Sequence, residues 1–379
     1  MSAGLLAIYS FGGSLDLYPL LYYGLKAMAN RGDVAIAYVH DGGDVRKIEL
    51  DLAKEDEKRR ATGRAAVGCV HVEDCCREVG EYIVCSFGPE RVAPSQRPDK
   101  TAYVALSRSG DIYAYRPPRL WHMAVGAYGF DFAIVATETA AVEVLGGEVR
   151  RSLKGGELLR INELGVESSG GGDVESVCAM EYIYVARPDS RIDGREVAEA
   201  RAELAKRLAK KAAFPADVVV GVPETGVYYA AYLASELGKG YRPAFVATAR
   251  GRSALLEEIG ERIAVIQLKA NVVESSVKGM RVLVVDDSII SGVTLRQIAQ
   301  QLRGRAGARE VYAAIASPPL VSRCPYGVVM PQESRMIFRK LASDEVARAL
   351  ELDGLAYLDV ADLKEAIKTP ICTRCFLSK

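Results

Sequence analysis

The feature that most constrains the fold of this chain is the stretch 281–303, where an apolar run leads into two aspartates, a loop of small residues and a helix-like segment. The run at 281–285 reads Arg-Val-Leu-Val-Val, and such β-branched sequences are typical of strands buried on both faces of a parallel sheet. Residues 295–303 have the apolar spacing of an amphipathic helix. This order predicts an open α/β sheet, in which ligands bind at the carboxyl ends of the strands.

The loop between the strand and the helix is suited to a phosphorylated sugar. Backbone N–H groups and the positive dipole end at a helix start bind phosphate. Asp286 and Asp287, just upstream, are acceptors for vicinal ribose hydroxyls or for Mg²⁺ held against substrate phosphates. The alternative is an ordinary strand-turn-helix in which the aspartates cap the helix. The predicted phosphate loop consists of Ser288, Ile289, Ile290, Ser291, Gly292, Val293 and Thr294.

Residues 282–294 resemble the binding motif for phosphoribosyl diphosphate (PRPP) in type I phosphoribosyltransferases. They are most similar to the version found in the glutamine amidophosphoribosyltransferase family. Ser291 and Val293 depart from that version, which has Arg and Thr at these two positions. Both changes remove groups that bind phosphate.

The resemblance implies two domains, of which the second spans residues 166–379. This part is expected to be an α/β type I phosphoribosyltransferase domain with a parallel sheet, which binds PRPP and Mg²⁺ and releases pyrophosphate. Asp286 and Asp287 are then the expected catalytic and Mg²⁺-binding residues. Arg252 lies in the segment that would close over the substrate and contact pyrophosphate.

Residues 1–165 resemble the N-terminal nucleophile glutaminase domain of the same family, an α+β sandwich of the αββα type. Ser2 stands where that family has its Cys nucleophile. The chain lacks the Arg-bearing segment that grips glutamine, contains no Asn-Gly dipeptide, and passes almost directly from Pro94 to the late strands. We therefore expect a reduced sandwich in which Ser2 is inactive. Catalysis depends on holding glutamine in position beside the nucleophile, and the residues that would hold it are missing.

The eight cysteines fall into two groups of four. A Cys-x-x-Cys near the chain end, combined with two distant cysteines, is a thiolate set suited to Zn²⁺ or to an iron–sulfur cluster. The resemblance favours a 4Fe–4S cluster, because iron–sulfur members of the family place their ligands in these sequence contexts. The predicted cluster ligands are Cys178, Cys324, Cys372 and Cys375. For the other four we expect buried apolar side chains and not a second metal site; they are Cys69, Cys75, Cys76 and Cys85.

Composition excludes several classes of function. The 379 residues include 49 basic and 49 acidic side chains, and this balance argues against general nucleic-acid binding. No apolar run reaches the ~18 residues that a membrane span needs, and the first residues lack a basic leader segment. We expect a cytoplasmic homo-oligomer without membrane partners. The three histidines have no second catalytic feature beside them, so structural roles are expected for His40, His71 and His122.

Together these expectations imply an enzyme of purine nucleotide biosynthesis that forms 5-phosphoribosylamine from PRPP. Ammonia, supplied by a separate source or a related catalytic subunit, would replace glutamine as nitrogen donor. The alternative is a non-catalytic paralogue that binds a phosphoribosyl ligand or a partner subunit and has a regulatory or redox-sensing role. Asp286, Asp287 and Gly292 favour the enzyme, whereas the missing Lys, Arg and Tyr residues of the closing segment favour the alternative.

Overall fold

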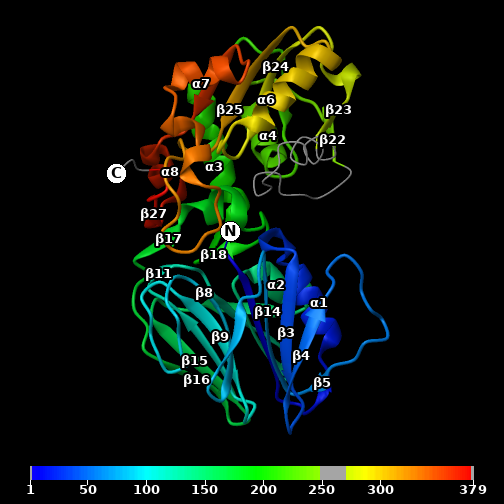
Figure 1. Cartoon of the computed structure of the whole chain (residues 1–379), viewed down its shortest axis with the longest axis vertical. Helices are drawn as coiled ribbons and strands as arrows, with labels where there is room; N and C mark the ends of the chain where they lie inside the picture. The colour runs from blue at the N-terminus through cyan, green and yellow to red at the C-terminus, as the bar shows by residue number, and fades with distance from the viewer. Residues whose placement is uncertain (1, 248–269, 377–379) are drawn as a thin grey trace.

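The computed structural model describes residues 2–247 and 270–376, which form two units joined end to end (Figure 1). The N-terminal unit is a sandwich of two antiparallel sheets, and the C-terminal unit is built on a parallel sheet. Within the described ranges, none of the helices is both long and apolar enough to cross a membrane.

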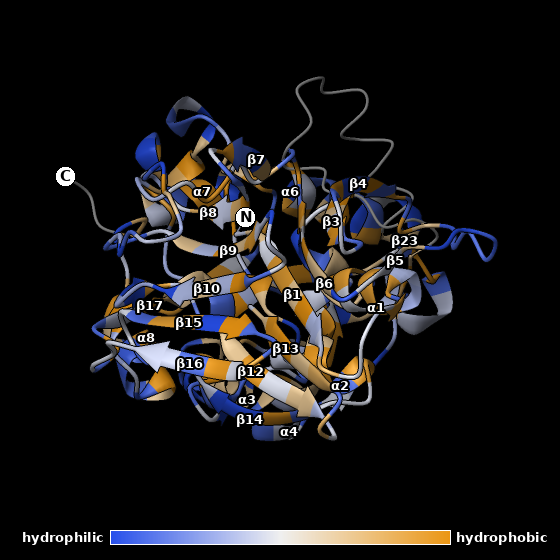
Figure 2. Ribbon diagram, turned by 90° about the horizontal axis from the view of Figure 1, so that it is seen from below, coloured by the Kyte–Doolittle hydropathy of each residue, from blue (hydrophilic) through white to orange (hydrophobic). Residues whose placement is uncertain are grey.

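The first sheet of the sandwich has the strand order β14-β12-β13-β1-β6-β3-β4. Both of its faces are covered: in β1, Leu5 packs toward the second sheet, while Leu6 and Ile8 pack beneath α1 and α2. Figure 2 shows these two helices beside the first sheet, on the side away from the second. The elements are β1 (Gly4–Ser10), β3 (Val34–His40), β4 (Val45–Leu50), β6 (Ala65–His71), β12 (Ala124–Tyr128), β13 (Phe132–Ala136), β14 (Glu148–Ser152), α1 (Tyr18–Lys26) and α2 (Thr139–Val144).

The second sheet has the order β16-β15-β10-β9-β8-β7, and within the described chain its outer face is covered by a loop and not by helices. Tyr103 donates its hydroxyl hydrogen bond to Pro94 O at 2.6 Å, and Tyr115 donates to Pro98 O at 2.9 Å. The short segment around Pro94 thus covers this face, and the described sandwich has helices on the outer face of the first sheet only, in agreement with the reduced form that the sequence predicts. The strands are β7 (Cys76–Val79), β8 (Tyr82–Phe87), β9 (Ala102–Ser107), β10 (Ile112–Arg116), β15 (Glu157–Asn162) and β16 (Gly165–Ser169).

The cysteines of the sandwich differ from expectation. We expect buried apolar thiols there, and Cys69 and Cys85 are indeed fully buried between the sheets. All four are nevertheless disulfide-bonded, Cys69 to Cys75 and Cys76 to Cys85. Sequence spacing could not reveal this, because only the crossover from β6 to β7 brings the adjacent pair between the two sheets.

The C-terminal unit contains a parallel sheet in the order β21-β20-β24-β25-β26. Successive residues of β24 pack into the hydrophobic cores on opposite faces of the sheet. Leu283 packs with α3, α4 and α8, whereas Val284 packs with α6 and α7. An uninterrupted apolar strand is therefore required, as the sequence predicts. The elements are β20 (Val218–Gly221), β21 (Gly240–Tyr241), β24 (Arg281–Asp286), β25 (Glu310–Ile315), β26 (Gly354–Tyr357), α3 (Val197–Lys211), α4 (Thr225–Glu236), α6 (Val293–Gln300), α7 (Ser343–Ala349) and α8 (Val360–Ile367).

A small parallel sheet joins the two units in the order β11-β17-β27. It combines β11 (Arg119–Leu120) of the sandwich, β17 (Ser176–Cys178) and β27 (Ile371–Cys372) of the C-terminal tail. Beside it, the fully buried Arg116 forms a two-pronged ion pair with Asp193, at 2.5 and 2.7 Å. Three further pairs of two-residue strands complete the fold: β2 (Leu15–Asp16) with β5 (Thr62–Gly63), β18 (Arg191–Ile192) with β19 (Arg195–Glu196), and β22 (Phe245–Val246) with β23 (Asn271–Val272).

Candidate functional site

The predicted substrate site lies at the carboxyl edge of the parallel sheet, where the paired strands β20 and β24 end side by side. The turn after β20 reaches the end of β24, since the N–H of Val222 donates to Val285 O at 2.9 Å. Gly226 packs so closely on the same carbonyl oxygen that a Cβ at this position would lie 2.4 Å from it. Position 226 therefore requires glycine and contributes no side-chain ligand.

The two aspartates are held firmly at this edge. Asp287 donates its N–H to Asp286 Oδ1 at 2.9 Å, and Ser288 Oγ donates to Asp287 Oδ1 at 2.6 Å. The carbonyl oxygens of both aspartates accept backbone hydrogen bonds from residues 316 and 317, at 3.0 and 2.8 Å, so the loop is anchored to the end of β25. Two fixed carboxylates supply the oxygen ligands that Mg²⁺ takes and the acceptors that ribose hydroxyls need.

Helix α6 begins directly after Gly292, whose φ of 75° lies in the left-handed region. Its N-cap residue, Gly292, has no side chain to cap it, and the first backbone bond of the helical ladder runs from Arg296 N to Gly292 O at 2.9 Å. The N–H groups of residues 293–295 come before that ladder, which is the arrangement that binds phosphate at helix starts.

The residues predicted to surround the phosphate divide into two kinds. Ile289 is 4% exposed and packs in the core beneath α6, and Ile290 packs against the opposite core, so both can offer only backbone groups. Ser288, Ser291 and Thr294 are half-buried and carry hydroxyls. Val293, the first residue of α6, is also half-buried and apolar. Binding at this loop therefore depends mainly on backbone N–H groups and hydroxyls.

Ser317 is a site residue that sequence reasoning missed. It follows β25, is 1% exposed, and donates its N–H to Asp287 O. Among the residues that the structure describes, its Oγ has no hydrogen-bond partner. Since buried polar groups are normally satisfied, this hydroxyl is a candidate ligand for substrate or for an ordered water. The only signal in the sequence is its position just beyond a buried strand. Arg252, the predicted pyrophosphate contact, lies outside the described residues.

The four cysteines predicted as cluster ligands are all free thiols, and the junction sheet brings them together. Cys178 and Cys372 are directly opposed in the β17–β27 pairing. Cys375 O accepts the N–H groups of residues 321 and 322, at 3.0 and 3.2 Å, which brings the tail against the segment that carries Cys324. Burial raises the pKa of Cys178 well above its usual range, and the other three thiols raise it further. Neutral thiols are therefore favoured until a cation offsets their charge.

The Ser2 hydroxyl lies in a buried network between the two units. It donates to Glu181 Oε1 at 2.5 Å and accepts from Arg31 Nη1 at 2.5 Å. Arg31, only 2% exposed, also contacts Glu181 Oε2 at 2.7 Å and Glu138 Oε1 at 2.6 Å. Burial alone would raise the pKa of Glu138, but Arg31 together with hydrogen bonds from Asn30 and neighbouring groups lowers it. The hydroxyl is thus a fixed member of an ionic network.

The space beside Ser2 is too small for an amino acid. The cavity there measures about 10 Å³, the room for roughly one water molecule. Phe87 and Trp121 line it and stack edge to face, with ring centroids 4.6 Å apart. His122 also lines it, and its ring nitrogens lie 3.2 Å from Thr137 O and 2.9 Å from Ser152 Oγ. Burial, with a contribution from Arg116, lowers the pKa of His122 to about 4, so this ring is neutral and structural, as predicted.

Comparison with known proteins places these features in a family. Residues 192–317 match the model of the phosphoribosyl transferase domain. The amidophosphoribosyltransferase of Bacillus subtilis is 32% identical, and the alignment covers 97% of this chain and 77% of that protein. That of Methanothermobacter thermautotrophicus is 32% identical over 91% of this chain and 73% of its own length. The match to the Archaeoglobus fulgidus amidophosphoribosyltransferase, 36% identical, covers 66% of this chain and 56% of that protein.

A solved structure extends the likeness to the whole fold. The glutamine PRPP amidotransferase of B. subtilis, complexed with ADP and GMP, superposes with a TM-score of 0.84 and 27% sequence identity. The superposition covers 99% of this chain and 96% of that one. Both the sandwich and the parallel-sheet unit are therefore present in the arrangement found in that enzyme, and the predicted fold class is confirmed.

Proposed function

The chain belongs to the amidophosphoribosyltransferase family, and from this premise we propose that it forms 5-phosphoribosylamine from PRPP with ammonia, and not glutamine, as nitrogen donor. The observation that carries the proposal is the contrast between its two sites. The edge of the parallel sheet retains fixed aspartates and a helix start with glycine at its N-cap, whereas the cavity beside Ser2 measures only about 10 Å³. A transferase site without a working glutaminase site leaves free ammonia as the nucleophile.

At the transferase site, the start of α6 would bind the 5′-phosphate through the N–H groups of residues 293–295. Asp286 and Asp287 would accept the ribose hydroxyls, and Ser288 would keep Asp287 oriented through their 2.6 Å hydrogen bond. Ammonia would attack C1 as the bond to pyrophosphate breaks, with positive charge developing on the ribose ring. Carboxylates held at this edge would stabilise that charge without reorganisation.

The residues at two further sites fit the expected cofactors. Asp286 and Asp287 offer the hard oxygen ligands that suit Mg²⁺, which when bound would neutralise the departing pyrophosphate. The four gathered thiols are the soft ligands that suit a 4Fe–4S cluster, which would tie the tail to β17. Burial raises the pKa of Cys178, Cys372 and Cys375, so assembly of the cluster on these thiols would release protons.

We divide the chain near residue 165, into a sandwich that no longer supplies nitrogen and a transferase unit that begins at residue 166. The network around Ser2 supports this division of roles. A glutamine substrate would have to displace Arg31 and Glu181 from the Ser2 hydroxyl and separate Phe87 from Trp121. A separate ammonia source or a related catalytic subunit would then serve the enzyme, which we expect to act as a homo-oligomer.

The test is pyrophosphate release by anaerobically purified protein supplied with PRPP, Mg²⁺ and ammonium. Wild type is expected to release pyrophosphate, and the Asp286→Asn, Asp287→Asn double variant to lose the activity by at least about 100-fold, the scale of lost electrostatic stabilisation. Asp344→Asn is the matched control, because that side chain is 78% exposed and lies on α7. Equal rates in the double variant and wild type would overturn the assignment.

A second arm replaces ammonium with glutamine. Neither glutamate nor pyrophosphate should then appear above background, and Ser2→Ala should change nothing. Glutamate release that Ser2→Ala abolishes would show a working glutaminase and refute that part of the proposal. If PRPP binds but ammonium supports no turnover, the protein is instead a phosphoribosyl-binding paralogue with a regulatory role.

A further inference from the structure

Four cysteine sulfurs meet inside the sandwich, far along the chain from the transferase cluster. Cys69 belongs to β6 of the first sheet and Cys85 to β8 of the second, and both are fully buried. Cys75 lies on the crossover between the sheets and is bonded to Cys69, and Cys76, the first residue of β7, is bonded to Cys85. The two disulfides touch, because Cys76 Sγ lies 3.6 Å from Cys69 Sγ.

This contact has the dimensions of a metal site. Zinc–thiolate bonds of about 2.3 Å in a tetrahedron put neighbouring sulfurs roughly 3.8 Å apart. The contact between Cys69 Sγ and Cys76 Sγ already has about that length, although the two sulfurs are not bonded to each other. The remaining two sulfurs are each bonded to one of this pair, so the four sulfurs form one continuous cluster.

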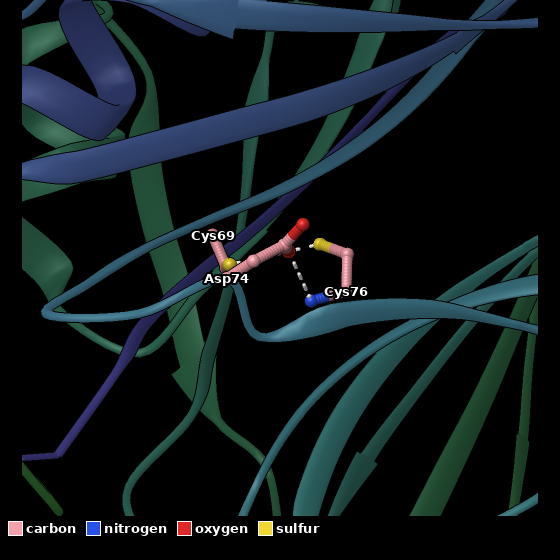
Figure 3. A group of neighbouring side chains, drawn as sticks. All are labelled: Cys69, Asp74 and Cys76. Carbon is pink, nitrogen blue, oxygen red and sulfur yellow. Dashed lines mark hydrogen bonds between the residues drawn. The ribbon is translucent and has the colours of Figure 1, made fainter.

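The neighbouring Asp74 supports the same geometry (Figure 3). Its carboxylate accepts the N–H of Cys76 at 2.9 Å, and it lies 3.6 Å from Lys47 Nζ. A carboxylate oxygen of Asp74 and the sulfurs of Cys69 and Cys76 lie within 4.8 Å of one another. Because Asp74 is already engaged with the backbone and with a lysine, it is suited to orienting the Cys75–Cys76 turn, as supporting residues do around metal ligands.

We propose that, in the reduced protein, Cys69, Cys75, Cys76 and Cys85 bind one Zn²⁺ ion between the two sheets. A phosphine reductant supplies two electrons to each S–S bond and is oxidised to the phosphine oxide, water supplies the oxygen and the two protons, and four thiols result. Zn²⁺ then binds four thiolates, and the four thiol protons pass to solvent. In the oxidised protein one disulfide ties β6 to the crossover and the other ties β7 to β8, so the same segments are held together in either redox state.

Thiolates are the preferred ligands of zinc, and a structural site with four protein ligands leaves no open position. The expected role is therefore to stabilise the sandwich and not to catalyse a reaction. The proposal is independent of the transferase activity, since the site is built from β6, β7, β8 and the crossover between the sheets.

The experiment uses the full-length protein, reduced anaerobically with a water-soluble phosphine and titrated with Zn²⁺. Each cysteine is then alkylated for a fixed time and the modified peptides are quantified by mass spectrometry. Zn²⁺ is expected to slow alkylation of the four sandwich cysteines together, by at least 10-fold. Alkylation of these four at the same rate with and without Zn²⁺ would overturn the proposal, and this readout needs no variant to fold.

Matched double variants separate this site from the thiols of the junction. Bound zinc per chain is measured in reduced wild type, in Cys69→Ser with Cys76→Ser, and in Cys372→Ser with Cys375→Ser. The first variant should bind one zinc fewer than wild type, and the second should keep the sandwich zinc. Oxidised wild type should lack that zinc. Equal zinc content in wild type and the first variant would contradict the proposal.

Discussion

The hydroxyl of Ser2 donates a 2.5 Å hydrogen bond to the carboxylate of Glu181, a residue 179 positions later in the chain. Glu181 follows three residues after Cys178, so the position of the family's nucleophile is connected directly to the junction between the units. Arg31 contacts both groups and also binds Glu138. A group that could attack glutamine is thereby a structural part of the contact between the two units.

Arg31→Met should be strongly destabilising. The substitution leaves Glu138 and Glu181 buried without their cation, and breaking a buried ion pair costs about 3–5 kcal/mol. The free energy of unfolding, measured by denaturant titration, should fall by this amount, and the pKa of Glu138 should rise. Arg46→Met is the matched control, because the Arg46 side chain is 75% exposed and should contribute little. Equal losses in both variants would show that the buried network is not specifically stabilising.

Gly292→Ala should weaken PRPP binding. Its φ of 75° strains any residue with a Cβ by about 1–2 kcal/mol, and the added carbon would lie 2.5 Å from Leu350 Cδ2. Because Gly292 sets the start of α6, we expect the KM for PRPP to rise at least several-fold. Gly304→Ala is the control: its Cβ would meet no atom within 4 Å, and its backbone is not left-handed. An unchanged KM in Gly292→Ala would mean that the helix start does not bind the phosphate.

His122 should make stability depend on pH. Its pKa is about 4 in the folded protein, against 6.5 for an unperturbed histidine, because burial disfavours the charged ring. Between about pH 4 and 6.5 the His122 ring is therefore protonated in the unfolded chain and neutral in the folded chain. The stability contributed by the neutral ring is complete above pH 6.5 and is lost as pH falls toward 4, by about 3 kcal/mol in all.

Unfolding titrations between pH 4 and 7 check this for wild type and His122→Gln, whose amide cannot titrate. The variant should lose a constant amount of stability from its altered hydrogen bonds to Thr137 and Ser152. The free energy of unfolding of the variant should change less steeply with pH over this range, by a slope that corresponds to at most one bound proton. Parallel profiles for the two proteins would show that His122 is not the titrating group.

Cys375→Ser should release the C-terminal tail. The tail is held by β27 and by backbone bonds from residues 321 and 322 to Cys375 O, and the proposed cluster would add a thiolate ligand at the same residue. Anaerobically purified variant should lack the visible absorbance of an iron–sulfur cluster, and limited proteolysis should cleave near residue 370 faster than in wild type. Ser322→Ala, which removes only a hydrogen bond to Arg374 O, should retain the absorbance. Full absorbance in Cys375→Ser would exclude this thiol as a ligand.

The strand, loop and helix at 281–303 could be predicted from the residues alone, because a buried parallel strand needs an unbroken apolar run and α6 needs one apolar face. The reduced form of the sandwich could be predicted as well, since the segment after Pro94 is too short to supply a further helical layer. Both features depend on residues that lie close together in the chain, so they can be inferred from the sequence.

The contacts between groups far apart in the chain became visible only in the folded molecule. Ser2 contacts Glu181 across 179 positions, Ser317 becomes an unsatisfied buried hydroxyl beside Asp287, and the adjacent Cys75 and Cys76 bond to different sheets. None of these contacts has a periodicity or a spacing that a sequence could display. They follow from the closure of the sandwich and its docking on the second unit, where close packing between segments far apart in the chain fixes the partners of each side chain.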